Sequence, residues 1–230
     1  MIIRMEEQRK DEEPVLETEF TVTKTLYIIR HGETDLNKRG VVQGRGIDSD
    51  INDHGQQQAE AFYQSYNHIP FDKIYTSTLK RTHQTVQRFI DSGIPWVQYP
   101  GLDELAWGVY EGKESSESLR TAFRQMMHYW LIGELHRKFE KGESPLEVKA
   151  RQLVVLEKLI EKNNSDRSVL ICMHGRAMRL FLCLLLDIPL TSMDKFPHLN
   201  TSLYKLEYNG NKFRITNFNN TDHLKNFISQ

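Results

Sequence analysis

The sequence predicts an α/β protein, a three-layer α/β/α sandwich with a mostly parallel central sheet. Two observations lead to this fold class. Strand and helix patterns alternate along most of the chain, as they do where helices connect parallel strands. The strands are continuous apolar runs, such as LYII at 26–29 and VLICM at 169–173, rather than alternating ones. Continuous runs are typical of strands that helices cover on both faces.

The N-terminal half of the chain supplies strands and helices in turn. Strands are expected at 26–30, 72–77 and 95–99, and helices at 55–68 and 79–93. The second of these helices runs into Gly93, and glycine commonly closes a helix because it tolerates the left-handed conformation there.

The C-terminal half continues the alternation and ends in a hairpin. We expect a mostly helical segment at 116–139, helices at 146–163 and 176–187, a strand at 167–173, and hairpin strands at 202–209 and 211–218. The helix at 146–163 is the best marked, because Ser144, Pro145 and Glu147 fit an N-cap, a first helical position and a capping box. Asn209-Gly210 is a typical hairpin turn.

The length of the chain, 230 residues, suits one domain. Residues 1–20 are polar and acid-rich and are interpreted as a tail, so the domain is expected at 21–230. Within it, residues 113–143 interrupt the alternation of strands and helices. This segment is predicted to be an insertion that forms a helical cap over one edge of the sheet.

The composition argues against several classes of partner. Hydrophobic residues make up 39% of the chain and charged residues 27%, with a net charge of -1, so no overall field attracts nucleic acid or an anionic membrane. The longest apolar run, 181–186, is too short to span a bilayer. The N-terminus shows no apolar stretch of signal-peptide length, so a cytoplasmic protein is expected.

Cys172 and Cys183 lie in apolar segments and are interpreted as core residues.

Cationic side chains follow three of the predicted strands. The strand at 26–30 ends in Arg30 and His31, the strand at 72–77 is followed by Arg81, and the strand at 167–173 is followed by His174. Ligands of open parallel sheets bind beyond the carboxyl ends of the strands. If these strands are neighbours, two arginines and two histidines meet there and form an anion site.

The residue types at this edge favour phosphate. A guanidinium group offers a planar fork of donors that matches a phosphate or a carboxylate. Glycine follows both histidines, as Gly32 and Gly175, which lets the main chain approach an anion closely. A neutral imidazole is a nucleophile that can accept a phosphoryl group. The edge is therefore predicted to bind a phosphate group beside a reactive histidine.

At these residues the sequence resembles the histidine phosphatase superfamily, whose fold is phosphoglycerate mutase-like. The resemblance runs from about residue 24 to residue 208 and rests on motifs in the family's order. These motifs are RHGET at 30–34 with Asn37, QGRGIDSDINDHGQQQA at 43–59, TSTLKRTHQT at 76–85, LDELAWGVYEG at 102–112, GESPLEVKAR at 142–151 and MHGRAMR at 173–179. One departure is Ile51, where the family usually has leucine.

The resemblance implies a role for each matching residue. It implies that His31 is the nucleophile that becomes phosphorylated, and that Glu104 is first the general acid and then the base. The other implied residues contact phosphoryl oxygens or substrate: Arg30, Arg81 and His174 for the oxygens, and Asn37, Gln43 and the main chain of Gly175 for the substrate.

These roles imply a metal-independent phosphomonoester hydrolase that acts through a phosphohistidine on a small phosphorylated metabolite, a histidine acid phosphatase-type enzyme. The scheme uses no metal and no other cofactor, and no Cys/His spacing in the chain suggests a zinc site. The neighbouring arginines disfavour a protonated His31, which keeps this side chain neutral for attack.

Two other activities on the same fold stay open. A phosphoglycerate mutase returns the phosphoryl group to a second position, and cofactor-dependent mutases carry an R-H-Y-G-type segment after the acid glutamate. The corresponding segment here is LAWGVYEGKESSE at 105–117, which is more similar to the phosphatases of the family. A non-catalytic phospho-ligand binder would be marked by loss of His31 or Glu104, and both are present.

The cap leaves the identity of the substrate open. Arg120, Arg124 and His128 recur at i, i+4 and i+8 and share one helix face, which either holds a second anionic group or is solvated. Trp107 and Trp130 either line an apolar part of the site or pack in the core. The sequence gives no oligomeric state. It also gives no catalytic role to the remaining histidines, which are His54, His68, His83, His136, His198 and His223.

Overall fold

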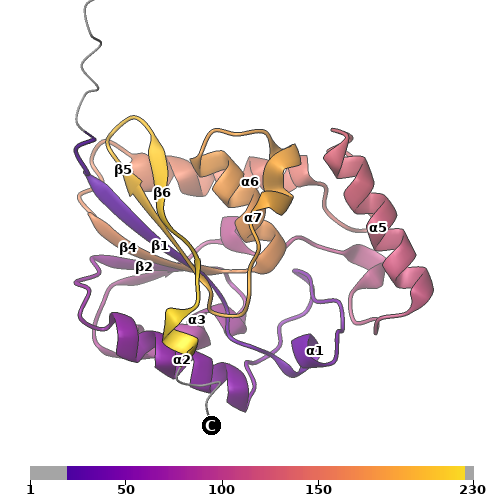
Figure 1. The fold of residues 1–230 in the computed structure, drawn as a ribbon, viewed down its shortest axis with the longest axis horizontal. Coiled ribbons are helices and arrows are strands. Elements are labelled where there is room, and N and C mark those ends of the chain that lie inside the picture. The colour runs from indigo at the N-terminus through magenta and orange to yellow at the C-terminus, as the bar shows by residue number, and fades with distance from the viewer. Residues whose placement is uncertain (1–19, 226–230) are drawn as a thin grey trace, which may run out of the picture.

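The computed structural model describes residues 20–225, so the tail predicted at 1–20 lies outside the described residues apart from its last position. A six-stranded sheet in the order β3-β2-β4-β1-β5-β6 forms the centre of the protein (Figure 1). The strands are β1 (Lys24–Arg30), β2 (Lys73–Thr76), β3 (Trp96–Gln98), β4 (Ser168–Met173), β5 (Leu203–Tyr208) and β6 (Phe213–Asn220).

The sheet is mostly parallel, as predicted. β1 pairs with β4, β4 with β2, and β2 with β3, all in parallel. β5 and β6 pair antiparallel along the other edge of β1, where they form the predicted hairpin. The register places Arg30 of β1 beside Met173 of β4, and Thr76 of β2 beside Cys172. The carboxyl ends of these three neighbouring strands are therefore aligned.

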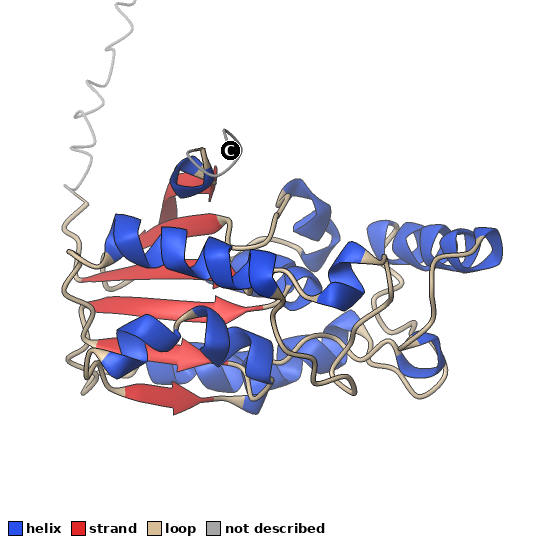
Figure 2. Ribbon diagram, turned by 90° about the horizontal axis from the view of Figure 1, so that it is seen from below, coloured by secondary structure: helices blue, strands red, loops and turns tan. Residues whose placement is uncertain are grey.

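Each face of the sheet carries its own hydrophobic core. Along β1, Leu26 and Ile28 pack into one core with residues of α6 (Pro145–Ile160) and α7 (Gly175–Leu185). Tyr27 and Ile29 point to the opposite face and pack into a second core with residues of α2 (Asp53–Tyr66) and α4 (Gln87–Asp91). Figure 2 shows helices on both sides of the strands. The predicted three-layer sandwich is confirmed.

The two cysteines belong to these cores, as predicted. Cys172 on β4 is buried on the α2 side, and Cys183 on α7 is buried on the other side. Both are free thiols, and their apolar surroundings account for them without a chemical role.

The helix predicted at 79–93 is two short helices, α3 (Lys80–Thr85) and α4, separated at Val86. Thr82 Oγ1 donates to the main-chain oxygen of Leu79 at 2.8 Å, and Thr85 Oγ1 donates to that of Arg81 at 2.6 Å. Such bonds from threonine to the main chain compete with regular helix bonding. The prediction of one continuous helix was wrong because it did not weigh these threonines.

The helix predicted at 146–163 is α6, and it begins as predicted. Ser144 is its N-cap, Pro145 is the first helical residue, and Glu147 completes a capping box. Its last helical residue is Ile160. The short helix α1 (Asp35–Lys38) was not predicted, although Thr34 and Asn37 form a capping box there as well.

The segment predicted at 116–139 is helical only as far as Leu131, as α5 (Glu117–Leu131). Gly133 follows with a φ of 95°, a left-handed conformation that ends the helix. In Figures 1 and 2, α5 lies on the side toward which the parallel strands point. The helix therefore lies where a cap over the strand ends is expected, and the division into a 21–230 domain with a 113–143 insertion stays a prediction.

Candidate active site

Three neighbouring strands deliver the predicted cationic side chains to one place. Arg30 is the last residue of β1, His174 follows β4, and Arg81 lies in the first turn of α3 after β2. β4 lies between β1 and β2, so the condition of the sequence argument is met. The ring centroids of His31 and His174 are 5.2 Å apart, and Arg81 Nε lies 3.2 Å from His174 Nδ1.

The imidazole of His31 is buried and held in one tautomer. Its Nδ1 lies 2.7 Å from the main-chain oxygen of Gly32. A carbonyl only accepts, so Nδ1 carries the proton and Nε2 keeps its lone pair. Burial, followed by the charges of Arg81 and Arg30, lowers the pKa of His31 well below its ordinary value. His31 is therefore a neutral imidazole with a nucleophilic Nε2.

His174 is also neutral, but both of its ring nitrogens are engaged. Arg81 Nε can only donate, so it donates to Nδ1, and Nε2 then donates to Ser77 Oγ at 2.7 Å. Burial and the charge of Arg81 lower the pKa of His174 well below its ordinary value. In this arrangement His174 orients Arg81. The contact to a phosphoryl oxygen implied for His174 stays a prediction.

The two arginines differ in how many of their donors are occupied. Arg81 is 1% exposed, and its terminal nitrogens donate to the main-chain oxygens of Ile47 at 2.7 Å and Gly44 at 3.4 Å. Arg30 Nε is buried with no hydrogen-bond partner within residues 20–225, and Arg30 Nη1 lies 3.4 Å from His198 Nδ1. Burial lowers the pKa of Arg30 to about 10, so it stays charged at neutral pH. Arg30 is thus a partly buried cation with donors available for an anion.

Glu104 lies at the N-terminus of α7, where main-chain N–H groups converge on its carboxyl group. Oε1 accepts from the main-chain N–H groups of Leu105 and Ala177, both at 2.9 Å, and Oε2 accepts from that of Arg176 at 3.2 Å. The N-cap residue of α7, His174, makes no side-chain cap bond. Glu104 therefore satisfies N–H groups that the start of a helix leaves unpaired.

The remaining predicted residues surround the loop after β1. Asn37 Oδ1 accepts from the main-chain N–H of Thr34 at 3.2 Å. Gln43 Nε2 donates to Thr34 Oγ1 at 2.7 Å. At Gly175, an added Cβ atom would lie 2.5 Å from Cε1 of His198, so any other residue there would displace that ring. The contacts of Asn37, Gln43 and Gly175 with a substrate stay predictions.

Three supporting residues were missed by the sequence argument. Asn200 Nδ2 donates to the main-chain oxygen of His31 at 2.9 Å, and His198 packs between Arg30 and Gly175. Arg151 pairs with Glu143 at 3.0 Å and donates to the main-chain oxygens of Pro100, Gly101, Asp103 and Glu104. The motif GESPLEVKAR contains Arg151, but only the tertiary structure shows which carbonyls it reaches.

The charged face of the cap helix is solvated. Arg120 and Arg124 both pair with Glu117, and their side chains are 54% and 67% exposed. His128 is exposed too. Of the two readings that the sequence left open, the solvated face is the one observed. Trp107 and Trp130 are buried in the core and stack with ring centroids 5.9 Å apart.

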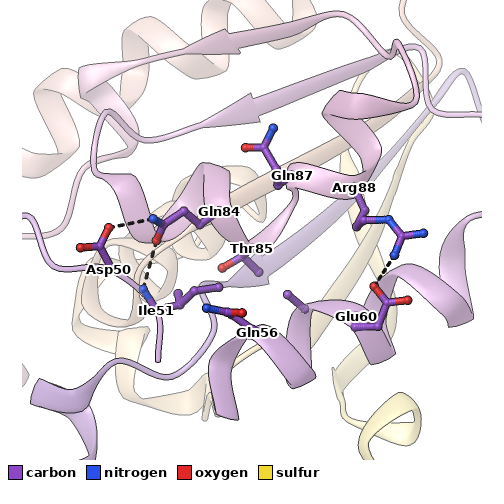
Figure 3. A pocket seen from close by; sticks show the side chains of 9 residues that line it. Asp50, Ile51, Gln56, Glu60, Gln84, Thr85, Gln87 and Arg88 are labelled. Carbon is purple, nitrogen blue, oxygen red and sulfur yellow. Dashed lines mark hydrogen bonds and ion pairs between the residues drawn. The ribbon is translucent and has the colours of Figure 1, made fainter. Parts of the chain in front are cut away.

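A separate pocket of about 480 Å³ lies between α2 and the α3–α4 segment (Figure 3). It contains none of the four converging cationic residues. Its polar side chains largely bind one another, since Gln84 bonds to Asp50 and to the main chain of Ile51, and Arg88 pairs with Glu60 at 2.7 Å. The pocket touches the site at Thr85, whose Oγ1 accepts from the main-chain N–H of Gly32 at 2.9 Å.

No helix among residues 20–225 is long and apolar enough to cross a membrane. No group of three or more His, Cys, Asp or Glu side chains in the same part of the chain is arranged to hold a metal ion.

The fold and the site together define an α/β protein that places a neutral imidazole between a buried and a partly buried arginine at the carboxyl edge of a parallel sheet. The sequence model of the histidine phosphatase superfamily (branch 1) matches residues 26–221. The chain therefore belongs to this superfamily, which confirms the family that the motifs suggested.

Similar proteins agree with this assignment. Phosphoserine phosphatase 1 of Hydrogenobacter thermophilus is 28% identical over 207 residues, which cover 88% of this chain and 95% of that protein. The human enzyme 6-phosphofructo-2-kinase/fructose-2,6-bisphosphatase 1 is 32% identical over 79% of this chain, which corresponds to only 36% of that longer protein. The solved structure of YhfR from Bacillus stearothermophilus superposes with a TM-score of 0.76 at 27% identity, covering 88% of this chain and all of that one. The phosphoglycerate mutase-like fold is thereby confirmed.

Proposed function

We propose that this protein is a metal-independent phosphomonoester hydrolase that acts on a small phosphorylated metabolite through a phosphohistidine at His31. One observation supports this most directly. The bond from His31 Nδ1 to the main-chain oxygen of Gly32 leaves Nε2 as a lone-pair nucleophile, on a ring whose pKa is lowered well below its ordinary value. Arg30 lies beside it with a buried, unpartnered Nε within the described residues.

In the first step, His31 Nε2 attacks phosphorus and the bond from phosphorus to the leaving oxygen breaks. Glu104 donates a proton to that oxygen. Negative charge on the transferring group is spread over its outer oxygens, where Arg30 supplies donors and Arg81 a fixed charge. His174 and the main-chain oxygens of Ile47 and Gly44 hold Arg81 in position, so the site needs little reorganisation.

In the second step, water attacks the phosphohistidine, and the bond from phosphorus to Nε2 breaks. Glu104, now ionised, takes a proton from the water, and inorganic phosphate leaves. Glu104 Oε2 receives one main-chain bond, at 3.2 Å, while Oε1 receives two. Oε2 therefore has the larger remaining capacity to hold the proton in transit.

The test is phosphate release from an aryl phosphate in excess EDTA by the parent protein, His31→Ala and His68→Ala. His68 is exposed and lies outside the site, so its variant is the matched control. We expect turnover in the parent and the control and none in His31→Ala, with a phosphohistidine trapped by a rapid quench into alkaline detergent only where turnover occurs. Chelator-sensitive activity that survives His31→Ala would refute the proposal. Phosphoryl exchange between substrates without phosphate release would favour the mutase alternative.

A further inference from the structure

The turn before β5, residues 200–202, is bonded to two residues of the candidate active site. The main-chain N–H of Thr201 donates to the main-chain oxygen of Arg30 at 2.9 Å, and the N–H of Arg30 donates back to the turn at 3.4 Å. Asn200 Nδ2 donates to the main-chain oxygen of His31 at 2.9 Å. The main-chain positions of Arg30 and His31 therefore depend on the conformation of this turn.

Thr201 adopts a backbone conformation that its side chain disfavours. Its φ is 57°, which lies in the left-handed region, where a residue branched at Cβ is a genuine outlier. Such a conformation persists only where surrounding contacts hold the residue in place. Thr201 is fully buried, so the contacts that hold it come from the protein itself.

The hydroxyl group of Thr201 is bonded to a histidine that lies far away in the sequence. Thr201 Oγ1 and His223 Nε2 are joined by a hydrogen bond of 3.1 Å. His223 belongs to η4 (Asp222–Leu224), the yellow coil beside α2 in Figure 1. Its ring packs edge-on against Phe62 and Tyr66 of α2, at centroid distances of 5.3 and 6.1 Å. His223 therefore links the turn to α2.

Packing alone does not account for a histidine at this place. Phenylalanine would fill the same space beside Phe62 and Tyr66 without a buried polar atom. His223 Nδ1 is buried with no hydrogen-bond partner in the described part of the chain, so the bond to Thr201 is the polar contact of the ring there. Burial lowers the pKa of His223 to about 4, so the ring is neutral at pH 7. What histidine adds to this aromatic cluster is the hydrogen bond to Thr201.

We propose that His223 is a positioning residue for the reaction at His31. Its hydrogen bond holds Thr201 in the left-handed conformation, and the turn at 200–202 then fixes the main chain of Arg30 and His31. The next carbonyl along the chain, that of Gly32, sets the tautomer of the His31 ring, so a displaced turn also disturbs the nucleophile. The kinetic consequence of this inference rests on the proposed hydrolase activity.

The first experiment removes the hydrogen bond and keeps the packing. His223→Phe retains an aromatic ring, and Thr201→Ala removes the hydroxyl group from the other side of the bond. We expect each variant to lower kcat/KM for an aryl phosphate by about threefold to tenfold, the equivalent of one hydrogen bond, at a temperature well below thermal unfolding. His223→Gln should restore most of the loss, because its amide group can bond to the same hydroxyl. His68→Phe is the control, since His68 is exposed.

A glycine at position 201 separates positioning from general stability. Glycine adopts the left-handed conformation without the penalty of a Cβ atom, so a turn with Thr201→Gly no longer needs His223. In that background we expect His223→Phe to lower kcat/KM by less than about twofold, because the effects of coupled residues are not additive. An equal loss in both backgrounds would mean that His223 acts independently of Thr201, which would overturn the inference.

A second readout does not depend on turnover. Long-range ¹H–¹⁵N spectra show which nitrogen of each imidazole carries the proton, and His31→Ala identifies the signals of His31. We expect these signals to shift or broaden in His223→Phe and in Thr201→Ala, and to keep their parental positions in His68→Phe. If His223→Phe does not fold, Thr201→Ala carries the same test.

The outcomes distinguish this inference from the hydrolase proposal. If the folded variants at His223 and Thr201 match the parent in both kcat/KM and the His31 signals, the inference is overturned and the hydrolase proposal stands. If the parent hydrolyses no phosphoester, the hydrolase proposal fails and the spectra decide the inference. It is then supported if the His31 signals move in the two variants but not in the control, and overturned if they do not move.

Discussion

Arginine occupies two contrasting places in this molecule, the strand ends and the cap helix α5. At the strand ends, Arg81 is 1% exposed and its nitrogens bond to an imidazole and two main-chain oxygens. On α5, Arg120 and Arg124 are 54% and 67% exposed and share Glu117. The two groups carry the same charge and the same donors.

The difference lies in what fixes the side chain. The acceptors that hold Arg81 are a neutral imidazole and two main-chain oxygens, none of which carries a negative charge. The positive charge of Arg81 can therefore attract an anion that enters the site. The arginines of α5 are neutralised by a carboxylate on their own helix and screened by water. Burial with fixed polar partners, rather than charge alone, therefore distinguishes the arginine that we propose to be catalytic from an arginine on the surface.

The largest effect is expected at Arg81. Arg81→Lys keeps the charge but loses the fork that contacts His174, Ile47 and Gly44. We expect kcat/KM for an aryl phosphate to fall by about 10²–10³-fold, the usual cost of losing one fixed group that stabilises a developing charge, because the lysine ammonium is no longer held in position. Steady-state kinetics would measure the fall, and circular dichroism would show whether the variant is folded. A folded variant with near-parental activity would contradict the claim that the fixed guanidinium group of Arg81 differs in function from the exposed arginines of α5.

A smaller effect is expected at Arg151, which holds the loop that carries Glu104. Arg151→Lys loses most of the bonds to the main-chain oxygens around Glu104. We expect a loss of about 1–3 kcal/mol in the free energy of unfolding and a fall of about tenfold or more in kcat, because Glu104 is no longer held in place. Urea unfolding and steady-state kinetics measure the two effects. Arg88→Lys, at an exposed pair with Glu60, is the control, and equal effects in both variants would contradict the positioning role.

Acid should lower the free energy of unfolding through two histidines that lie outside the cap, His198 and His223. Burial lowers the pKa of His198 to about 3 and that of His223 to about 4, from an ordinary value of 6.5. The unfolded chain therefore binds protons that the folded protein does not. Stability is complete above about pH 6.5 and falls as the pH drops toward these values, by up to about 1.4 kcal/mol per pH unit for each histidine. Thermal unfolding between pH 7 and 4.5 measures the fall in stability. His198→Gln should make this fall smaller. Identical pH profiles for parent and variant would exclude His198 as a source.

The smallest effect is expected on α5. Arg124→Gln should change the free energy of unfolding by no more than about 0.5 kcal/mol and the activity toward an aryl phosphate by less than about twofold. Thermal unfolding and steady-state kinetics test both values. A large loss of activity would mean that α5 turns this face toward the substrate during turnover.

The strand-end arginines could be predicted from sequence because the fold itself places them. Continuous apolar strands predict parallel neighbours, and the residue after each strand must lie at the shared carboxyl edge. Arg30, His31, Arg81 and His174 all satisfy that argument. The orientation of the arginines on the cap helix was harder to predict. Helical periodicity shows which residues share a face, but it does not show where that face points. On α5, the opposite face carries Leu119, Met126 and Trp130, and their burial decides that the arginines face water.

Other residues could not be predicted because their partners come from tertiary structure. Arg151 reaches main-chain oxygens about fifty positions earlier in the chain, and any exposed arginine on a helix has the same local sequence signal. His198 lies in a segment without regular periodicity, and its place above Gly175 depends on how 196–200 folds over α7. Arg176 was quoted within MHGRAMR, but its pairing with Asp194 is visible only in three dimensions.

The position of Glu104 has an evolutionary consequence. Its carboxyl group also caps α7, so replacing it with alanine leaves the main-chain N–H groups of Leu105, Arg176 and Ala177 without their acceptor, at a cost of about 1–3 kcal/mol for each one left unpaired. A descendant that abandons catalysis is still under selection to keep this glutamate for stability. A glutamate here is thus weak proof that a relative is an active enzyme. An engineer who wants an inert phosphate-binding scaffold should begin at His31 and leave Glu104 alone.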